Sequence, residues 1–196
     1  MRDPNRLPGP RDIRTTLDGD DNDGVVVACP PHPQFGGDRH DGRLRAVSDA
    51  LRDREWDCLR IDYGAWDEGR GERSDALTAI EWADERYETV ALFGYSFGGA
   101  VALAAGIEAE GLAALSALAP AADSVAGFDP ADLDDVSCPA QIVYGERDDT
   151  ADWKPVVDRA EQLGWTVESM PADHFFVSQQ GRVGELVGEF IAGTHS

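Results

Sequence analysis

The sequence predicts one α/β domain, with a three-layer, doubly wound and mostly parallel sheet covered by helices on both faces. Short apolar runs alternate with amphipathic stretches from about residue 24 to the end of the 196-residue chain, a pattern typical of parallel strands joined by helical crossovers. No repeat or linker divides the chain. Residues 1–10 hold three prolines and show no periodicity. We therefore expect a flexible arm over 1–10 and a single domain over 11–196.

The first half of the chain alternates between strand and helix candidates. The run Val25-Val-Val-Ala-Cys29 is continuously apolar, as in a strand buried on both faces. Leu44, Val47 and Leu51 recur at the spacing of one helical face. In chain order we expect an edge strand over 13–17, strands over 25–29, 56–61 and 89–93, and helices over 43–54, 72–86 and 100–109.

The second half continues the same alternation. We expect strands over 112–118, 140–144 and 165–170, and helices over 154–163 and 183–192. Only about twenty residues separate the first two of these strands, which is too short for a lid domain.

The strongest chemical motif lies where the strand over 89–93 meets the next helix. The segment Gly94-Tyr-Ser96-Phe-Gly98-Gly99 contains G-x-S-x-G between a strand and a helix. A sharp turn there would expose the serine hydroxyl to a base and a substrate carbonyl, and glycines would remove clashing side chains. Because a chain with 21 glycines forms this pattern readily, the prediction of Ser96 as nucleophile depends on the context. A glycine-rich turn without chemistry is the alternative.

Two later segments offer a base and an acid. His174 follows the strand over 165–170, and Asp148 follows the strand over 140–144. Side chains at the carboxyl ends of strands gather at one edge of an open α/β sheet, and Ser, Asp, His is the chain order that accompanies this motif. We predict His174 as general base and Asp148 as the acid that orients it. Other nearby carboxylates are alternatives for the acid: Asp123, Asp149 and Asp152.

The loop after the first buried strand is the candidate for contact with an oxyanion. In proteins with the G-x-S-x-G turn, one backbone N–H comes from this loop and a second from the residue after the nucleophile. The second donor is therefore Phe97. Pro33 has no N–H, so we favour Gln34 as the first donor, with Phe35 as the alternative. The loop could also be a rigid turn with no part in catalysis.

Nothing in the sequence indicates a cofactor. One group of possible metal ligands has a spacing that matches no ligand pattern: His32, Asp38, His40 and Asp41. The three cysteines form no C-x-x-C pair and are expected to be small thiols in a reducing compartment: Cys29, Cys58 and Cys138. We expect a cytoplasmic protein that needs no metal and no organic cofactor.

These residues together resemble the α/β-hydrolase superfamily over nearly the whole chain, closest to its small lidless dienelactone-hydrolase-like and carboxylesterase-like members. The resemblance is carried by four segments: Gly94-Tyr-Ser96-Phe-Gly98-Gly99, Gly145-Glu-Arg-Asp148, Asp173-His174-Phe175 and His32-Pro-Gln-Phe-Gly36-Gly37. The last is similar to the His-Pro…Gly-Gly loop of small bacterial and archaeal relatives. Two positions depart from the pattern, because His32-Pro33 replaces the usual His-Gly and dienelactone hydrolases carry Cys at the position of Ser96.

The resemblance implies the α/β-hydrolase fold without a lid domain. It also implies that Ser96, Asp148 and His174 form a triad that cleaves a small ester or related acyl bond through an acyl-enzyme. An acyltransferase or peptidase on the same scaffold and a binding protein without activity are the alternatives. Without a lid, short loops shape the pocket, and we expect it to be lined by aromatic residues: Phe35, Trp66, Tyr95, Phe97, Trp153, Phe175 and Phe176.

The composition is strongly acidic, with 38 Asp and Glu against 17 Lys and Arg and a net charge of −21. Such a surface repels phosphate backbones and anionic lipid, which argues against nucleic-acid and membrane partners. Salt screens the self-repulsion, so we interpret the composition as an adaptation to salt, with an ordinary acidic protein as the alternative. The chain shows neither an apolar run of membrane-helix length nor a secretory signal. We expect a small-molecule acyl substrate as partner. The sequence leaves open whether the chain forms a homodimer.

Overall fold

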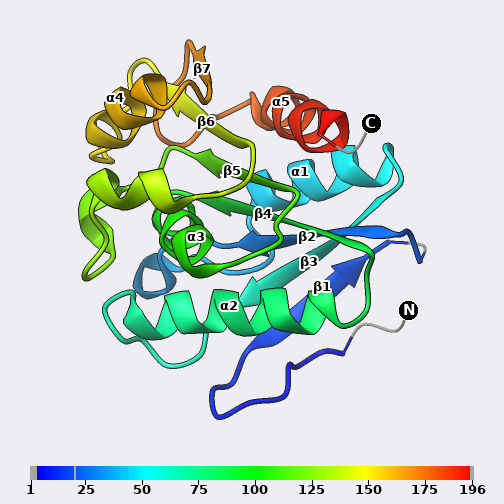
Figure 1. Cartoon of the computed structure of the whole chain (residues 1–196). Coiled ribbons are helices and arrows are strands. Elements are labelled where there is room, and N and C mark those ends of the chain that lie inside the picture. The colour runs from blue at the N-terminus through cyan, green and yellow to red at the C-terminus, as the bar shows by residue number, and fades with distance from the viewer. Residues whose placement is uncertain (1–3, 20, 195–196) are drawn as a thin grey trace.

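The computed structural model describes residues 4–19 and 21–194. Within these residues one seven-stranded sheet has the order β1-β3-β2-β4-β5-β6-β7 (Figure 1). Strand β1 pairs antiparallel with β3, and the other neighbouring pairs are parallel. The strands are β1 (Arg14–Asp18), β2 (Gly24–Cys29), β3 (Trp56–Asp62), β4 (Thr89–Tyr95), β5 (Ala114–Leu118), β6 (Ala140–Gly145) and β7 (Thr166–Met170). The predicted doubly wound, mostly parallel sheet is confirmed.

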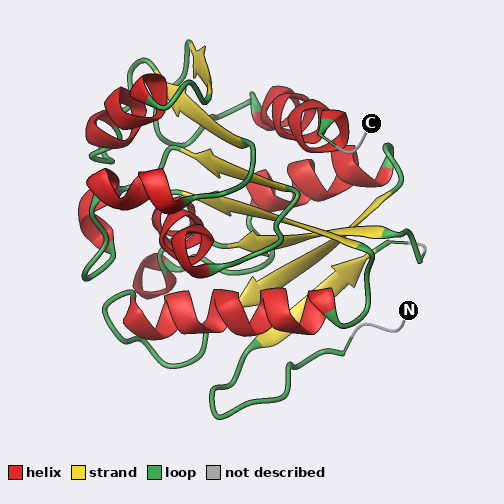
Figure 2. Cartoon of the chain, viewed as in Figure 1, coloured by secondary structure: helices red, strands yellow, loops and turns green. Residues whose placement is uncertain are grey.

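Helices cover both faces of the sheet (Figure 2). The α-helices are α1 (Gly42–Arg52), α2 (Arg70–Asp84), α3 (Phe97–Glu108), α4 (Lys154–Gln162) and α5 (Gln180–Gly193). Helices α1 and α5 pack together on one face, whereas α2, α3 and α4 lie on the other. Three short 3-10 turns complete the described elements: η1 (Pro33–Phe35), η2 (Ala122–Ser124) and η3 (Pro130–Asp135).

The central strands are apolar on both faces because each face has its own core. In β2, Val25 and Val27 belong to the core under α2 and α3, and Val26 and Ala28 belong to the core under α1 and α5. All four are fully buried. Burial on two faces explains why the sequence of this strand shows a continuous apolar run rather than alternation.

Strand β4 and helix α3 are longer than the sequence predicts, and only Ser96 separates them. Glycines at 94, 98 and 99 have weak intrinsic preference for either structure, so the sequence predicts a strand that ends at 93 and a helix that begins at 100. Tertiary packing overrides this preference, because α3 is buried without interruption from Phe97 to Gly106. The serine therefore occupies a one-residue turn at the carboxyl end of the central strand.

The amino-terminal segment is attached to the sheet in the part that the structure describes. Residues 1–3 of the predicted arm lie outside the described residues. Leu7 is buried, its N–H donates to the carbonyl of Ile13 over 2.9 Å, and Arg6 forms an antiparallel bridge with Arg14. Among the described residues, no helix combines the length and the apolar character needed to cross a membrane.

Candidate active site

Ser96 lies in the turn between β4 and α3 with a backbone conformation that is rare outside glycine. Its φ is 58° and its ψ is −119°, which strains an L-residue and persists only where the surroundings enforce it. The Ser96 N–H donates to the carbonyl of Leu118 over 2.8 Å, and the Ser96 carbonyl accepts from the N–H groups of Gly99 and Ala100. Hydrogen bonds from β5 and from the first turn of α3 thus hold the serine in place.

The glycines on either side of Ser96 are required by backbone approach. A Cβ at Gly94 would lie 1.9 Å from the carbonyl oxygen of Gly98. A Cβ at Gly98 would lie 2.3 Å from the carbonyl oxygens of both Cys29 and Pro30. Because these contacts are with main chain, no side-chain rotation can relieve them. The serine turn (residues 94–98) is therefore packed backbone against backbone.

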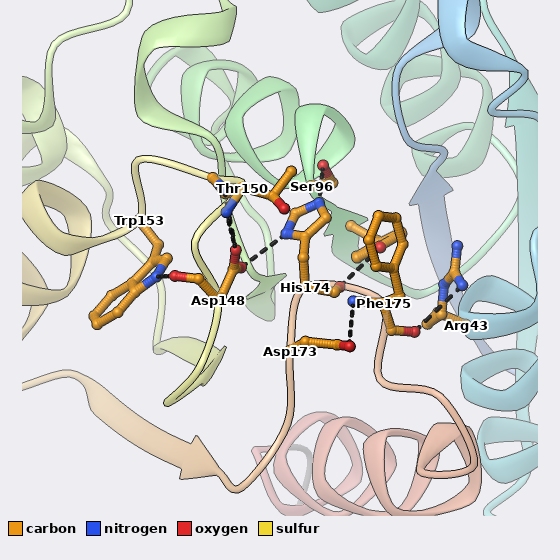
Figure 3. A network of polar contacts seen from close by, with 10 residues as sticks. Arg43, Ser96, Asp148, Thr150, Trp153, Asp173, His174 and Phe175 are labelled. Carbon is orange, nitrogen blue, oxygen red and sulfur yellow. Dashed lines mark hydrogen bonds and ion pairs between the residues drawn. The ribbon is translucent and has the colours of Figure 1, made fainter.

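A continuous hydrogen-bonded path joins the three predicted triad residues, which come from the carboxyl ends of β4, β6 and β7 (Figure 3). Ser96 Oγ lies 2.8 Å from His174 Nε2, and His174 Nδ1 lies 2.7 Å from Asp148 Oδ2. An ionised carboxylate can only accept, so Nδ1 carries the imidazole proton and Nε2 is left to accept from the serine hydroxyl.

The carboxylate of Asp148 is fully buried and satisfied on both oxygens. Oδ2 faces His174, and Oδ1 accepts from the N–H groups of Thr150 at 2.9 Å and Ala151 at 3.0 Å. These backbone bonds fix the direction of the carboxylate toward the imidazole. The alternative acid Asp123 is exposed and lines the cavity instead.

The backbone N–H groups predicted as oxyanion donors differ in the acceptors that they have in the structure. Phe97 is the first residue of α3, so its N–H has no intrahelical acceptor. In η1, the N–H of Gln34 donates to His32 Nδ1 over 3.3 Å, and the N–H of Phe35 donates to the His32 carbonyl over 3.1 Å. Both candidate donors of this loop are thus engaged within the turn, Gln34 by the longer and weaker bond.

His32 stands in a group of aromatic rings beside the serine turn. Its ring centroid lies 4.5 Å from that of Trp66, 4.6 Å from that of Phe35 and 4.8 Å from that of Phe97. Burial lowers the pKa of His32, so the ring is neutral at pH 7 and Nδ1 keeps a lone pair for Gln34. Trp66 supports His32 rather than lining the cavity, contrary to the sequence prediction.

A cavity of about 480 Å³ opens over Ser96 and His174. Four of the predicted aromatic residues line it: Phe35, Tyr95, Phe97 and Phe175. Phe176 and Trp153 do not, because Phe176 is fully buried in the core and Trp153 stacks on Tyr144 with ring centroids 4.4 Å apart. Sequence patterns cannot separate a core aromatic from a pocket aromatic in the same loop.

The cavity has two unlike sides. The segment between β2 and α1 supplies aromatic residues, glycines and the charged Asp41 on one side of Ser96, and its Phe35 is 87% exposed. The segments after β5 and β6 supply small and polar residues on the other side: Ala121, Asp123, Ser124, Thr150 and Ala151. Since β2 and β5 flank β4 in the sheet, the two sides face each other across the serine.

Two further side chains, those of Tyr95 and Arg43, donate to backbone carbonyls beside the catalytic histidine candidate. Tyr95 Oη donates to the carbonyl of His174 over 2.9 Å, and Arg43 Nη1 donates to the carbonyl of Phe175 over 3.4 Å. Sequence reasoning assigned no such role to either residue. Among the described residues, no group of three or more His, Cys, Asp or Glu side chains is arranged to hold a metal ion.

The sheet order, the serine turn and the histidine that follows the last strand define an α/β-hydrolase fold without a lid domain. Solved structures with the same fold include a serine hydrolase homologue from Coxiella burnetii, with 23% identity, a TM-score of 0.81 and coverage of 93% of this chain and 94% of that one. A lidless α/β serine hydrolase from Xanthomonas campestris has 25% identity and a TM-score of 0.76, covering 93% and 91%.

An esterase from Pyrococcus furiosus is similar over 95% of this chain and 89% of its own, with 16% identity and a TM-score of 0.77. No protein-family model and no curated protein matches the sequence. At these identities the likeness establishes the fold and leaves the reaction to the geometry of the site.

Proposed function

We propose that this protein is a serine hydrolase that cleaves an ester or related acyl bond, with Ser96 as nucleophile, His174 as base and Asp148 as orienting acid. The observation that carries the proposal is the unbroken path from Ser96 Oγ through the imidazole to a buried carboxylate, with contacts of 2.8 and 2.7 Å. The serine hydrolases and the esterase among the structural neighbours support it.

In the proposed reaction His174 Nε2 takes the proton of Ser96 as Oγ attacks the acyl carbonyl. The tetrahedral intermediate collapses when Nε2 returns this proton to the leaving oxygen, so the alcohol departs and an acyl-enzyme remains. Water then loses a proton to Nε2 and attacks the acyl carbon. Nε2 returns this proton to Ser96 Oγ as the second intermediate collapses and releases the acid. Asp148 stabilises the imidazolium in both halves.

The N–H groups of Phe97 and Gln34 are proposed to bind the oxyanion. Phe97 offers an N–H with no intrahelical acceptor at the positive end of α3. Gln34 must exchange its 3.3 Å bond to His32 for a bond to the oxyanion, which a charged acceptor favours over a neutral one. Phe35 remains the alternative for this position.

The form of the cavity favours a small, uncharged ester with one apolar group. The aromatic side of the cavity suits an apolar group, because the charges of Asp41 and Arg43 on that side are paired with each other. The polar side suits a small group. The net charge of −21 disfavours anionic substrates. Esters of increasing acyl length, and acetates of increasing alcohol size, would identify which part of the substrate lies against Phe35.

The proposed nucleophile is tested by labelling with a fluorophosphonate, which phosphonylates activated serines. We expect the wild-type chain to be labelled and the mass increase to lie on Ser96. Ser96→Ala should lose labelling and lower kcat on an activated ester by about 10⁵- to 10⁶-fold, with an unchanged melting temperature. Ser124→Ala, a second serine of the cavity, is the matched control. Wild-type turnover by Ser96→Ala would contradict the proposal.

We further propose that the chain is adapted to high salt. Its 38 acidic side chains repel one another, and raising salt to about 1 M shortens the screening length to about 3 Å. The melting temperature should therefore rise between 0.1 and 2 M KCl. Sucrose, which stabilises folded proteins without screening charge, is the control, and an equal rise in both would argue for an ordinary acidic protein.

A further inference from the structure

The segment that carries His174 has no regular secondary structure. We call residues 171–179, between β7 and α5, the histidine loop. It contains two non-glycine residues with positive φ, Phe176 at 50° and Ser178 at 62°. The Ala172 carbonyl accepts from the N–H of Arg147 over 3.0 Å, and the side chain of Phe176 is fully buried. Residues 173–175 lie between these two anchors, and the N–H of Phe175 donates to Asp173 Oδ1 over 3.0 Å.

Two side chains from distant elements hold the main chain within this span. Tyr95, the last residue of β4, donates its buried hydroxyl to the His174 carbonyl over 2.9 Å. Arg43, in the first turn of α1, donates to the next carbonyl, that of Phe175, over 3.4 Å. Figure 3 shows Arg43 on the side of Phe175 opposite Asp148. His174 is thus held by its ring on one side and by its main chain on the other.

Tyr95 and Arg43 also support each other. The Arg43 guanidinium lies over the Tyr95 ring at 4.5 Å from its centroid. Asp41 forms an ion pair with Arg43 and caps α1 by accepting from the Arg43 N–H over 2.8 Å. Burial raises the pKa of Tyr95, so its hydroxyl stays protonated and able to donate throughout the working range of a serine hydrolase. Both donors are therefore fixed before any substrate binds.

We propose that Tyr95 and Arg43 are positioning residues, which hold the His174 main chain at the distance where its imidazole meets Ser96. The inference rests on the proposed function. A displacement of about 1 Å at a reacting group can lower a rate by about 100-fold. Neither the Tyr95 hydroxyl nor the Arg43 guanidinium contacts the reacting atoms. Their loss should therefore act through the position of His174 and lower the rate of the chemical step.

Tyr95→Phe is the direct test, because it removes one oxygen and keeps the ring that lines the cavity. Tyr87→Phe is the matched control. Tyr87 also donates a buried hydroxyl, to Asp57 over 3.0 Å, but it lies just before the amino end of β4. Both variants should lose stability, and Tyr87→Phe at least as much as Tyr95→Phe, because the acceptor of Tyr87 is a carboxylate. Only Tyr95→Phe should slow fluorophosphonate labelling and lower kcat, each by about tenfold, with KM changed less than about twofold.

Arg43 supplies a second, independent variant if Tyr95→Phe folds poorly. Arg43→Lys keeps a cation over the Tyr95 ring and should lower kcat by about threefold, whereas Arg43→Met should lower it by about tenfold. The double variant Tyr95→Phe/Arg43→Met should lose less than the product of the two single losses, because both residues act on one span.

The outcomes separate the inference from the function on which it rests. If the wild-type chain is not labelled, the proposed function fails and the positioning role fails with it. If the wild-type chain is labelled at Ser96 but Tyr95→Phe reacts as fast as Tyr87→Phe, only the positioning role is overturned. A rise in KM at constant kcat would overturn it as well, because the pair would then act on substrate binding.

Discussion

The serine turn and the histidine loop lie side by side in the site, but different forces hold them. In the serine turn, glycines allow main chain to pack on main chain, and a Cβ at Gly94 would lie 1.9 Å from a backbone oxygen. The start of the histidine loop also packs on a glycine, because a Cβ at Gly145 would lie 2.6 Å from the Ala172 carbonyl oxygen. At His174 and Phe175, however, side chains far away in sequence hold the backbone carbonyls, as Tyr95 holds that of His174 over 2.9 Å. Changes in the turn should therefore affect folding and activity together, whereas changes around the loop should affect mainly activity.

Among the variants that test this comparison, Asp148→Asn should give the largest effect, because Asp148 is the partner of His174 in the loop. The amide can donate to Nδ1, which favours the tautomer with its proton on Nε2, and this tautomer cannot accept from Ser96. We expect kcat to fall by about 10⁴-fold with little change in melting temperature. Asp149→Asn, at the exposed neighbouring position, is the control and should stay within about twofold of wild type. A loss below tenfold in Asp148→Asn would remove Asp148 from the proposed triad.

Gly98→Ala tests the turn side. The added methyl group meets the carbonyl oxygens of Cys29 and Pro30 at 2.3 Å, so backbone must move, and overpacking of this kind costs about 1–3 kcal/mol. Urea unfolding should show this loss together with slower labelling of Ser96. Gly181→Ala is the control, because nothing lies within 4 Å of its added Cβ and alanine favours a helix. Unchanged stability in Gly98→Ala would contradict the claim that changes in the serine turn affect folding and activity together.

Arg147→Ala should have the smallest effect and separates exposed from buried contacts of the loop. Arg147 Nη2 donates to the Pro171 carbonyl over 2.8 Å at an exposed position, and Gln179 donates to the same oxygen over 3.2 Å. An exposed bond with a second donor contributes less than about 1 kcal/mol, so kcat should change less than about twofold. If kcat instead fell as far as in Tyr95→Phe, burial would not be what distinguishes the two contacts.

The sequence predicted the parts of the site that depend on local pattern. The alternation of apolar runs located the strands, and G-x-S-x-G located the serine turn because its glycines are adjacent in sequence to the residue they serve. His174 and Asp148 were predicted because parallel strands bring their carboxyl ends to one edge. The structure then placed these side chains in contact.

The remaining features depend on contacts between distant segments. Arg43 and Phe175 are 132 residues apart, and Tyr95 and His174 are 79 apart, so no local pattern relates them. The geometry of η1, which directs the Gln34 N–H to His32 Nδ1, follows from the packing of His32 among neighbouring rings. For the same reason the sequence could not separate Phe175, which lines the cavity, from Phe176, which is buried in the core.

Cys29 and Cys58 are buried and Cys138 is partly buried, which has a practical consequence. Burial raises the pKa of the thiols of Cys29 and Cys58 to about 12 and that of Cys138 to about 11. Thiolate, the form that reacts with maleimides, is therefore scarce at neutral pH. A new cysteine on an exposed loop would react far faster than the native three. A fluorescent dye can thus be attached at one introduced cysteine without prior removal of the native three.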